Sequence, residues 1–158
     1  MNLTLADVRR LVRMAFPARR VDGFESLSGG LCNINLKILF ESNEAPVVLR
    51  LYRHDPVAVQ KEVELLSLVR KTVPVPEVLH ANYEGIDHSG PFAFIEFVAG
   101  PTFQQLRRTN DVPAIRQASY KVGQTLAAIG SFGFTKPGRL GPGLCVGEPY
   151  LEADEDRV

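Results

Sequence analysis

The chain has 158 residues, of which 45% are apolar and 23% are charged, and 18 basic residues balance 18 acidic ones. The length suffices for one domain with a core, and the balanced charge argues against a nucleic-acid or membrane-surface binder, whose affinity comes mainly from concentrated positive charge. No apolar run approaches the roughly 20 residues that span a bilayer. The two cysteines, Cys32 and Cys145, indicate neither a disulfide framework nor a zinc site. These features predict a soluble protein of the reducing cytoplasm.

The first segment, residues 3–16, predicts an amphipathic helix. Thr4 and Asp7 can form a capping box, and apolar residues recur at helical spacing at Leu5, Val8, Leu11, Val12 and Ala15. The acidic Asp7 and the lack of an uninterrupted apolar stretch argue against a secretory signal, whereas a basic mitochondrial presequence is an alternative. We favour a helix that packs on the domain.

Three strands are predicted next, and they form an antiparallel meander. The first covers residues 21–27, and a turn at Ser28, Gly29 and Gly30 leads into the second. The second strand, from Cys32 to Phe40, alternates apolar and polar residues, which is typical of a half-buried strand. A polar turn at residues 41–44 separates it from the third strand, residues 47–52.

A helix is predicted to follow, with Asp55 as the N-cap residue and Pro56 at the first helical position. It runs to about Lys71, where two prolines direct the chain into a short strand over residues 77–81. After a polar loop, residues 92–98 form a nearly continuous apolar strand, which predicts a place in the interior of the sheet.

Beyond Gly100 the pattern changes to helices. A short helix is expected over residues 103–108 and a longer one from Pro113 to Ile129. One face of the longer helix is apolar and carries Ile115, Ala118, Val122, Leu126 and Ile129. Residues 130–149 are rich in glycine and proline and predict a loop, and the acidic end from residue 151 has no pattern.

Two adjacent glycines at the first turn allow the backbone to approach a ligand and to direct N–H groups at phosphate oxygens. The turn is neither a dinucleotide fingerprint nor a Walker A loop, because a strand follows it and no Gly-Lys-Ser/Thr occurs. By itself it is explained better as a simple hairpin turn.

Arg50 is more informative because it shares one face of an apolar strand with Val48 and Tyr52. A buried charge there needs a partner or an anion, although an edge-strand arginine could instead point to solvent. Glu62 is a suitable partner, since the helix positions three, four and seven residues later are apolar. Glu64 has polar neighbours and is expected to be solvated surface. The alternative is that Glu62 lies at the edge of the stripe and reaches water.

Together these segments resemble the aminoglycoside phosphotransferase and choline kinase-like superfamily. The resemblance covers roughly residues 20–135 and rests on Leu27-Ser-Gly-Gly with Asn33, Val47-Val-Leu-Arg-Leu-Tyr52, Lys61-Glu-Val-Glu-Leu-Leu66, Val73-Pro-Val-Pro-Glu-Val78 and Phe94-Ile-Glu-Phe-Val-Ala-Gly100. It implies an α+β fold: the nucleotide-binding lobe of a protein-kinase-like fold, with a five-stranded, mostly antiparallel sheet and one packed helix. The N-terminal helix and the first helices of a truncated second lobe complete it. We expect the nucleotide-binding lobe at 1–98 and the incomplete helical lobe at 99–158.

The resemblance also implies a role for each matching residue in binding ATP. Arg50 contacts the phosphates, where many kinases use lysine, and Glu62 orients it. Ile95 lies behind the adenine, the Glu96 carbonyl and the Val98 N–H bond its edge, and Leu27 and Val48 form apolar walls. The glycine turn, Ser28, Gly29 and Gly30 with Asn33, completes the set. His80 is expected to be structural, and Cys32 is a buried strand cysteine or, alternatively, a reactive one.

The residues that perform phosphoryl transfer in this superfamily, a His-Gly-Asp string with a later Asn and a second aspartate, do not occur in the sequence. We therefore expect a fragment of a longer kinase or a naturally short relative, with no turnover alone and with Mg²⁺ only in the full-length enzyme. The function predicted is the ATP-binding part of a small-molecule phosphotransferase, whose hydroxyl acceptor stays open among aminoglycosides, choline, homoserine and others. The alternative is a non-catalytic interaction or regulatory module. The exposed face of the last helix predicts self-association or disorder.

Overall fold

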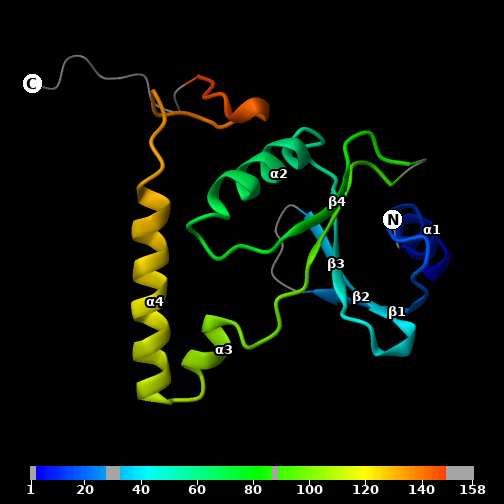
Figure 1. The fold of residues 1–158 in the computed structure, drawn as a ribbon, viewed down its shortest axis with the longest axis horizontal. Coiled ribbons are helices and arrows are strands. Elements are labelled where there is room, and N and C mark those ends of the chain that lie inside the picture. The colour runs from blue at the N-terminus through cyan, green and yellow to red at the C-terminus, as the bar shows by residue number, and fades with distance from the viewer. Residues whose placement is uncertain (1–2, 28–32, 87–88, 149–158) are drawn as a thin grey trace, which may run out of the picture.

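A computed structural model describes residues 3–27, 33–86 and 89–148 (Figure 1). The predicted glycine turn at Ser28, Gly29 and Gly30, together with Cys32 and the acidic C-terminal segment, lies outside these residues. Where the structure describes the chain, no helix is long and apolar enough to cross a membrane.

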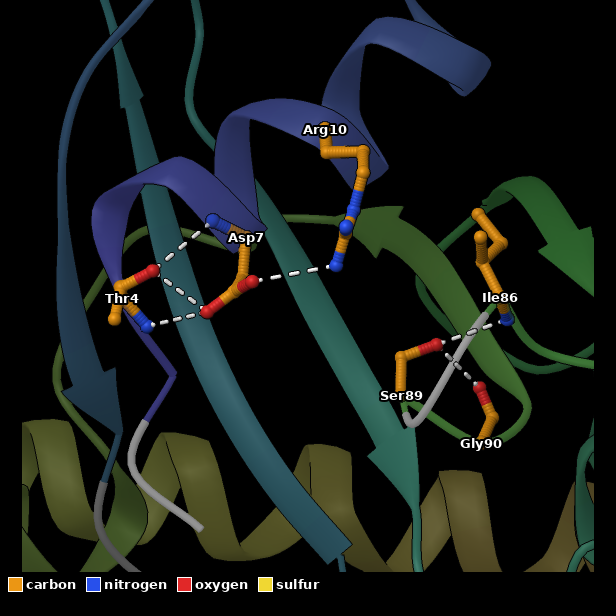
Figure 2. A network of polar contacts seen from close by, with 6 residues as sticks. All are labelled: Thr4, Asp7, Arg10, Ile86, Ser89 and Gly90. Carbon is orange, nitrogen blue, oxygen red and sulfur yellow. Dashed lines mark hydrogen bonds and ion pairs between the residues drawn. The ribbon is translucent and has the colours of Figure 1, made fainter.

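The first helix, α1 (Leu5–Ala15), begins at the predicted capping box. The Thr4 Oγ1 accepts a hydrogen bond from the Asp7 N–H at 3.3 Å, and the Asp7 Oδ2 accepts one from the Thr4 N–H at 2.9 Å (Figure 2). Bonds from the Thr4 side chain and backbone, together with the Arg10 charge, lower the pKa of Asp7. The buried residues Val8, Leu11 and Val12 confirm a helix that packs on the domain.

Five strands form one sheet in the order β1-β2-β3-β5-β4, and every neighbouring pair is antiparallel. Their bounds are β1 (Val21–Leu27), β2 (Asn33–Phe40), β3 (Val47–Tyr52), β4 (Val78–Asn82) and β5 (Phe92–Glu96). A short 3₁₀ helix, η1 (Glu41–Asn43), connects β2 to β3. The predicted interior position of the apolar strand is confirmed, because β5 lies between β3 and β4. It is two residues shorter than predicted, ending at Glu96.

A helix covers each face of the sheet (Figure 1). On one face, α1 packs over the larger core, which includes Ile38, Leu49 and Phe94. On the other face lies α2 (Ala58–Val69), over a smaller core built around Val48, Tyr52, Val59, Ala93 and Ile95. The second face carries the residues that the sequence singled out.

The predicted start of α2 is wrong by about two residues. The N-cap residue is Val57 rather than Asp55, and Pro56 lies in the turn before the helix. Asp55 instead shapes that turn, because its carboxylate accepts from the Val57 N–H at 3.2 Å and its carbonyl accepts from the Ala58 N–H at 3.0 Å. An aspartate before a proline serves equally well in a turn, so composition alone could not separate the two.

The remaining helices are α3 (Phe103–Arg107) and α4 (Val112–Gly130), which pack on one another. Figure 1 shows α4 standing apart from the sheet. No residue of α4 is buried, which agrees with the exposed apolar face predicted for it. After α4 the chain returns to α2, where a second 3₁₀ helix, η2 (Pro142–Leu144), packs against it.

Candidate functional site

The strand register places one row of side chains on the α2 face of the sheet. Leu27 pairs with Asn35, Asn35 with Arg50, and Arg50 with Ala93. Paired residues of antiparallel strands project to the same face, so the row crosses β1, β2, β3 and β5. The next row, toward the other ends of these strands, contains Lys37, Val48 and Ile95. Arg50 therefore lies in the middle of the sheet, with an amide on one side and the small Ala93 on the other.

Arg50 forms the ion pair that the sequence predicted. Its Nη1 donates to the Glu62 Oε1, and its Nε donates to the Asn35 Oδ1 at 2.9 Å. The side chains are half-buried, at 26% and 23% exposure for Arg50 and Glu62. Two nitrogens of the guanidinium are thus held within the protein. The third, Nη2, donates no hydrogen bond to any residue that the structure describes.

Tyr52 holds the other oxygen of the same carboxylate. The Tyr52 hydroxyl donates to the Glu62 Oε2 at 2.8 Å, and the tyrosine itself is only 2% exposed. Burial raises the pKa of Tyr52 to about 12, an effect that the nearby Arg50 charge partly opposes. The hydroxyl therefore keeps its proton, and remains a donor, throughout the neutral pH range.

An apolar cluster lies beside this polar network. Val48 and Ile95 are nearly fully buried in the smaller core, and Leu27 and Phe97 pack against them. Three residues that were expected to surround an adenine, Leu27, Val48 and Ile95, are thus brought together. The cluster shares its strands with the Arg50 ion pair, so apolar and cationic surfaces adjoin on one face.

The other predicted site residues lie at the edges of this arrangement. Glu96 ends β5, where its N–H donates to the Glu77 carbonyl at 2.8 Å and its carboxylate accepts from the Glu77 N–H at 3.0 Å. Val98 follows the strand and is 67% exposed. Asn33 begins β2 opposite Tyr52 and is half-buried. The structure brings Asn33 near the polar network and leaves Val98 at the surface.

Glu64, which the sequence predicted to be solvated surface, is partly exposed and is also bonded to two groups of the protein. Its Oε2 accepts from the Gly143 N–H at 2.6 Å, and its Oε1 accepts from the Gln60 side chain at 2.9 Å. The carboxylate therefore fastens η2 to α2. The polar neighbours of Glu64 along the helix gave no sign of this partner, because Gly143 is far away in the sequence.

A cavity of about 800 Å³ does not contain the Arg50 pair. It lies between the start of α2 and the segment 139–148, and an ion pair of 3.7 Å between Arg139 and Asp55 crosses it. We place the candidate site at Arg50 because a half-buried cation with an uncommitted nitrogen is better suited to bind an anion. Over the described residues, no group of three metal-ligating side chains is found, so no Mg²⁺ site is assigned.

Sequence reasoning missed two residues of the network, Asn35 and Tyr52. Tyr52 was recognised as a face-mate of Arg50, but its contact with Glu62 depends on how α2 packs. Asn35 is one of three polar residues that alternate along the second strand, and only the register selects it. The signal that could have pointed to these residues is the period of two along each strand. It places Tyr52 on the same face of β3 as Arg50, and it places the polar residues of β2 on one face.

A strand cation paired with a helix carboxylate, on a five-stranded antiparallel sheet, is the arrangement of the kinase-like class of folds. The model of the phosphotransferase enzyme family matches residues 24–155, and the chain belongs to this family. No curated protein matched the chain.

Solved structures share the fold at low sequence identity. A thermostable mutant of the aminoglycoside phosphotransferase APH(4)-Ia, in a ternary complex with AMP-PNP and hygromycin B, is 22% identical with a TM-score of 0.61. The match covers 90% of this chain and 45% of that one. APH(4)-Ia itself gives 21% identity, a TM-score of 0.61 and coverage of 92% and 47%.

The streptomycin–ATP–APH(2")-IIa ternary complex is 15% identical, with a TM-score of 0.53 and coverage of 85% of this chain and 42% of that one. The chain thus spans less than half the length of each of these three structures.

Proposed function

We propose that the chain is the ATP-binding part of a small-molecule phosphotransferase. The observation that carries the proposal is the Arg50 network: Glu62 and Asn35 hold two nitrogens of the guanidinium and leave the third for an anion. Holding the cation in advance reduces the conformational entropy lost on binding. A guanidinium forms charge-assisted hydrogen bonds with phosphate oxygens, and these are stronger than bonds between neutral groups.

The apolar cluster supplies the second half of the site. Leu27 and Val48 are proposed as walls of the adenine slot, with Ile95 behind the base. The Glu96 carbonyl and the Val98 N–H are proposed to bond the edge of the adenine. Asn33 and the turn of Ser28, Gly29 and Gly30 are proposed to surround the phosphates.

The acceptor proposed for the complete enzyme is a small molecule with a hydroxyl group, to which the γ-phosphate of ATP is transferred. Family membership and the fold support this reaction class. The similar structures were solved with AMP-PNP and hygromycin B or with ATP and streptomycin, which are ligands of those proteins. We propose the cytoplasm as the compartment, where the exposed free thiol of Cys145 stays reduced.

Titration calorimetry with ATP tests the binding proposal, using Arg50→Ala and Arg70→Ala. Arg70 is a matched control, because it also pairs with a glutamate, Glu77, at 2.9 Å. We expect wild type and Arg70→Ala to bind ATP, and Arg50→Ala to bind at least tenfold more weakly. Equal affinity of all three proteins would contradict the proposed site. Absence of binding by wild type would favour a non-catalytic interaction or regulatory module.

We further propose that these 158 residues hold the nucleotide without transferring its phosphate. The sequence contains no His-Gly-Asp string to supply a catalytic aspartate. Incubation with ATP, Mg²⁺ and a panel of hydroxyl acceptors should give no phosphorylated product by mass spectrometry. ATP-dependent phosphorylation of any acceptor by the purified chain, lost in Arg50→Ala, would contradict this part of the proposal.

A further inference from the structure

A second cationic site lies on the face of the sheet opposite Arg50. A cavity of about 330 Å³ is found between the end of α1, the connection to β1 and the start of η1. We call it the arginine cavity, and its lining residues are Arg9, Arg13, Pro17, Arg19, Arg20, Val21 and Glu41. Four arginines and one glutamate therefore line this cavity.

Two of the four arginines are fixed by the protein. Arg9 donates through Nε and Nη2 to the Val21 carbonyl, at 3.4 and 3.3 Å. Arg19 lies over the Phe40 ring, with its Cζ 3.5 Å from the ring centroid, and its Nε forms an ion pair with Glu44 at 2.6 Å. These contacts fix the positions of Arg9 and Arg19 in the cavity wall. Only the charge of Arg19 is neutralised, by its ion pair with Glu44.

The other two arginines, Arg13 and Arg20, are uncommitted. Both are exposed, and neither side chain forms a hydrogen bond or ion pair within the described parts of the chain. Arg13 is in the last turn of α1, where the helix dipole favours a cation. That accounts for one charge. Arg20 lies outside the helix, so the helix dipole does not stabilise its charge. Its backbone is held in place, because its carbonyl accepts from the Glu41 N–H at 3.0 Å.

The excess charge is unusual for this chain, whose formal net charge is zero. Gathering like charges around one cavity raises the electrostatic energy of the folded state unless an anion offsets it. The cavity is at the small end of ligand sites, which span roughly 300–1,000 Å³. Val8, Leu11 and Val12 bury the apolar face of α1 in the core, and Met14, at 48% exposure, is the large apolar side chain that this helix leaves at the surface. That is too little apolar surface for a helix to insert into a bilayer.

We propose that the arginine cavity binds a small phosphate-bearing ligand, such as a phosphate monoester or pyrophosphate. Arginine forks match the geometry of phosphate oxygens and bind them with two bonds each. Arg13 and Arg20 make these contacts, while Arg9 and Arg19 supply charge from fixed positions. This site is independent of the proposed ATP site, because it is on the other face of the sheet.

Pyrophosphate is the probe for the test, titrated by calorimetry into wild type, Arg50→Ala and the double variant R13Q/R20Q. Saturable binding is expected in wild type and should persist in Arg50→Ala. In R13Q/R20Q combined with Arg50→Ala, affinity should fall at least tenfold below that of Arg50→Ala, because the Arg50 site can no longer bind pyrophosphate in either protein. The unfolding temperature of R13Q/R20Q should not fall below that of wild type, because neither side chain forms a hydrogen bond or ion pair with a described residue and their loss relieves the repulsion between like charges. R107Q/R116Q, which removes two arginines of α3 and α4, is the matched control for net charge.

Three results would overturn the proposal. The first is absence of saturable pyrophosphate binding in the Arg50→Ala protein. The second is equal affinity of that protein with and without R13Q/R20Q. The third is an equal loss in R107Q/R116Q, which would indicate non-specific charge attraction. Vesicles containing anionic lipid form a separate arm: R13Q/R20Q-sensitive vesicle binding without pyrophosphate binding would replace the small ligand by a membrane surface.

Discussion

Arg50 uses two of its nitrogens inside the protein, on Asn35 and Glu62, and this makes arginine specific at the position. A lysine has one ammonium group on a flexible stem and lacks the planar fork that reaches both partners while facing a ligand. We predict that Arg50→Lys weakens ATP binding about tenfold, which corresponds to about 1.4 kcal/mol. Titration calorimetry measures the change. Wild-type affinity in Arg50→Lys would show that only the positive charge matters.

Glu62 and Glu64 can be compared directly, because they lie two residues apart on α2 and have different partners. Glu62 pairs with Arg50, and Glu64 accepts from η2. Glu62→Gln should lower ATP affinity, since a neutral amide holds the guanidinium less firmly. Glu64→Gln should leave affinity unchanged and instead loosen η2, because Glu64 accepts the Gly143 N–H. Calorimetry measures the affinity, and amide hydrogen exchange of residues 139–148 measures the loosening. The assignment of the two carboxylates would be refuted if Glu64→Gln lowered ATP affinity and Glu62→Gln increased the hydrogen exchange of residues 139–148.

Tyr52 predicts a pH dependence of stability. Its pKa is about 12 in the folded protein, against 10.0 normally, so the folded state keeps a proton that the unfolded state releases. The stabilisation that comes from the neutral hydroxyl is fully present below pH 10 and is lost as the pH rises to about 12, with a size of about 3 kcal/mol. Denaturant unfolding of wild type and Tyr52→Phe should therefore converge over this range. A constant difference between the two proteins would contradict the burial argument.

The Arg50–Glu62 pair could be predicted from sequence because helical phase selects Glu62 and strand alternation isolates Arg50. Asn35 required the β2–β3 register, and the Glu62 contact of Tyr52 required the position of α2 over the sheet. Neither the register nor the helix position follows from periodicity, since both are set by packing between distant segments.

The strands of the sheet could be predicted because β2 alternates apolar and polar residues, whereas β3 and β5 are nearly continuous apolar runs. β1 and β3 have the predicted bounds, and α4 differs by one residue at each end. The start of α2 was wrong because Asp55 serves a turn. The predicted end of β5 was wrong because Phe97 and Val98, although apolar, lie outside the sheet. Apolar sequence predicts burial, but hydrogen-bond partners decide where a strand ends.

Helix α4 presents apolar side chains to solvent. Its large apolar side chains are exposed, with Tyr120 at 69%, Leu126 at 62%, Ile129 at 46% and Val122 at 45%. Exposed apolar faces of this kind favour association. We predict that the chain self-associates through α4, with a second copy as the partner.

Light scattering after size-exclusion chromatography measures this association over a range of concentrations. The double variant V122E/L126E should shift the protein to monomer. Gln124→Glu, which adds charge at another exposed position of α4, should not. A monomer at every concentration, with α4 still helical, would refute the prediction.

At the scale of the whole molecule, two opposed faces of one sheet carry two cationic sites. The α2 face presents Arg50 beside apolar residues, as a nucleotide requires, and the α1 face presents arginines with little apolar surface. The division into lobes at residues 98 and 99 stays a prediction. The family model places the chain in the phosphotransferase enzyme family, whereas the reaction and its acceptor are proposals for the complete protein.

Direct contact between Arg50 and a phosphate is the central claim, and NMR of the arginine side-chain Nε–Hε groups tests it directly. With AMP-PNP, the Arg50 signal should shift saturably, while the signals of Arg70 and Arg116 stay in place. Adenosine, which lacks phosphates, should leave Arg50 unchanged. Saturable AMP-PNP binding that shifts adenine-slot residues but not Arg50 would contradict the account.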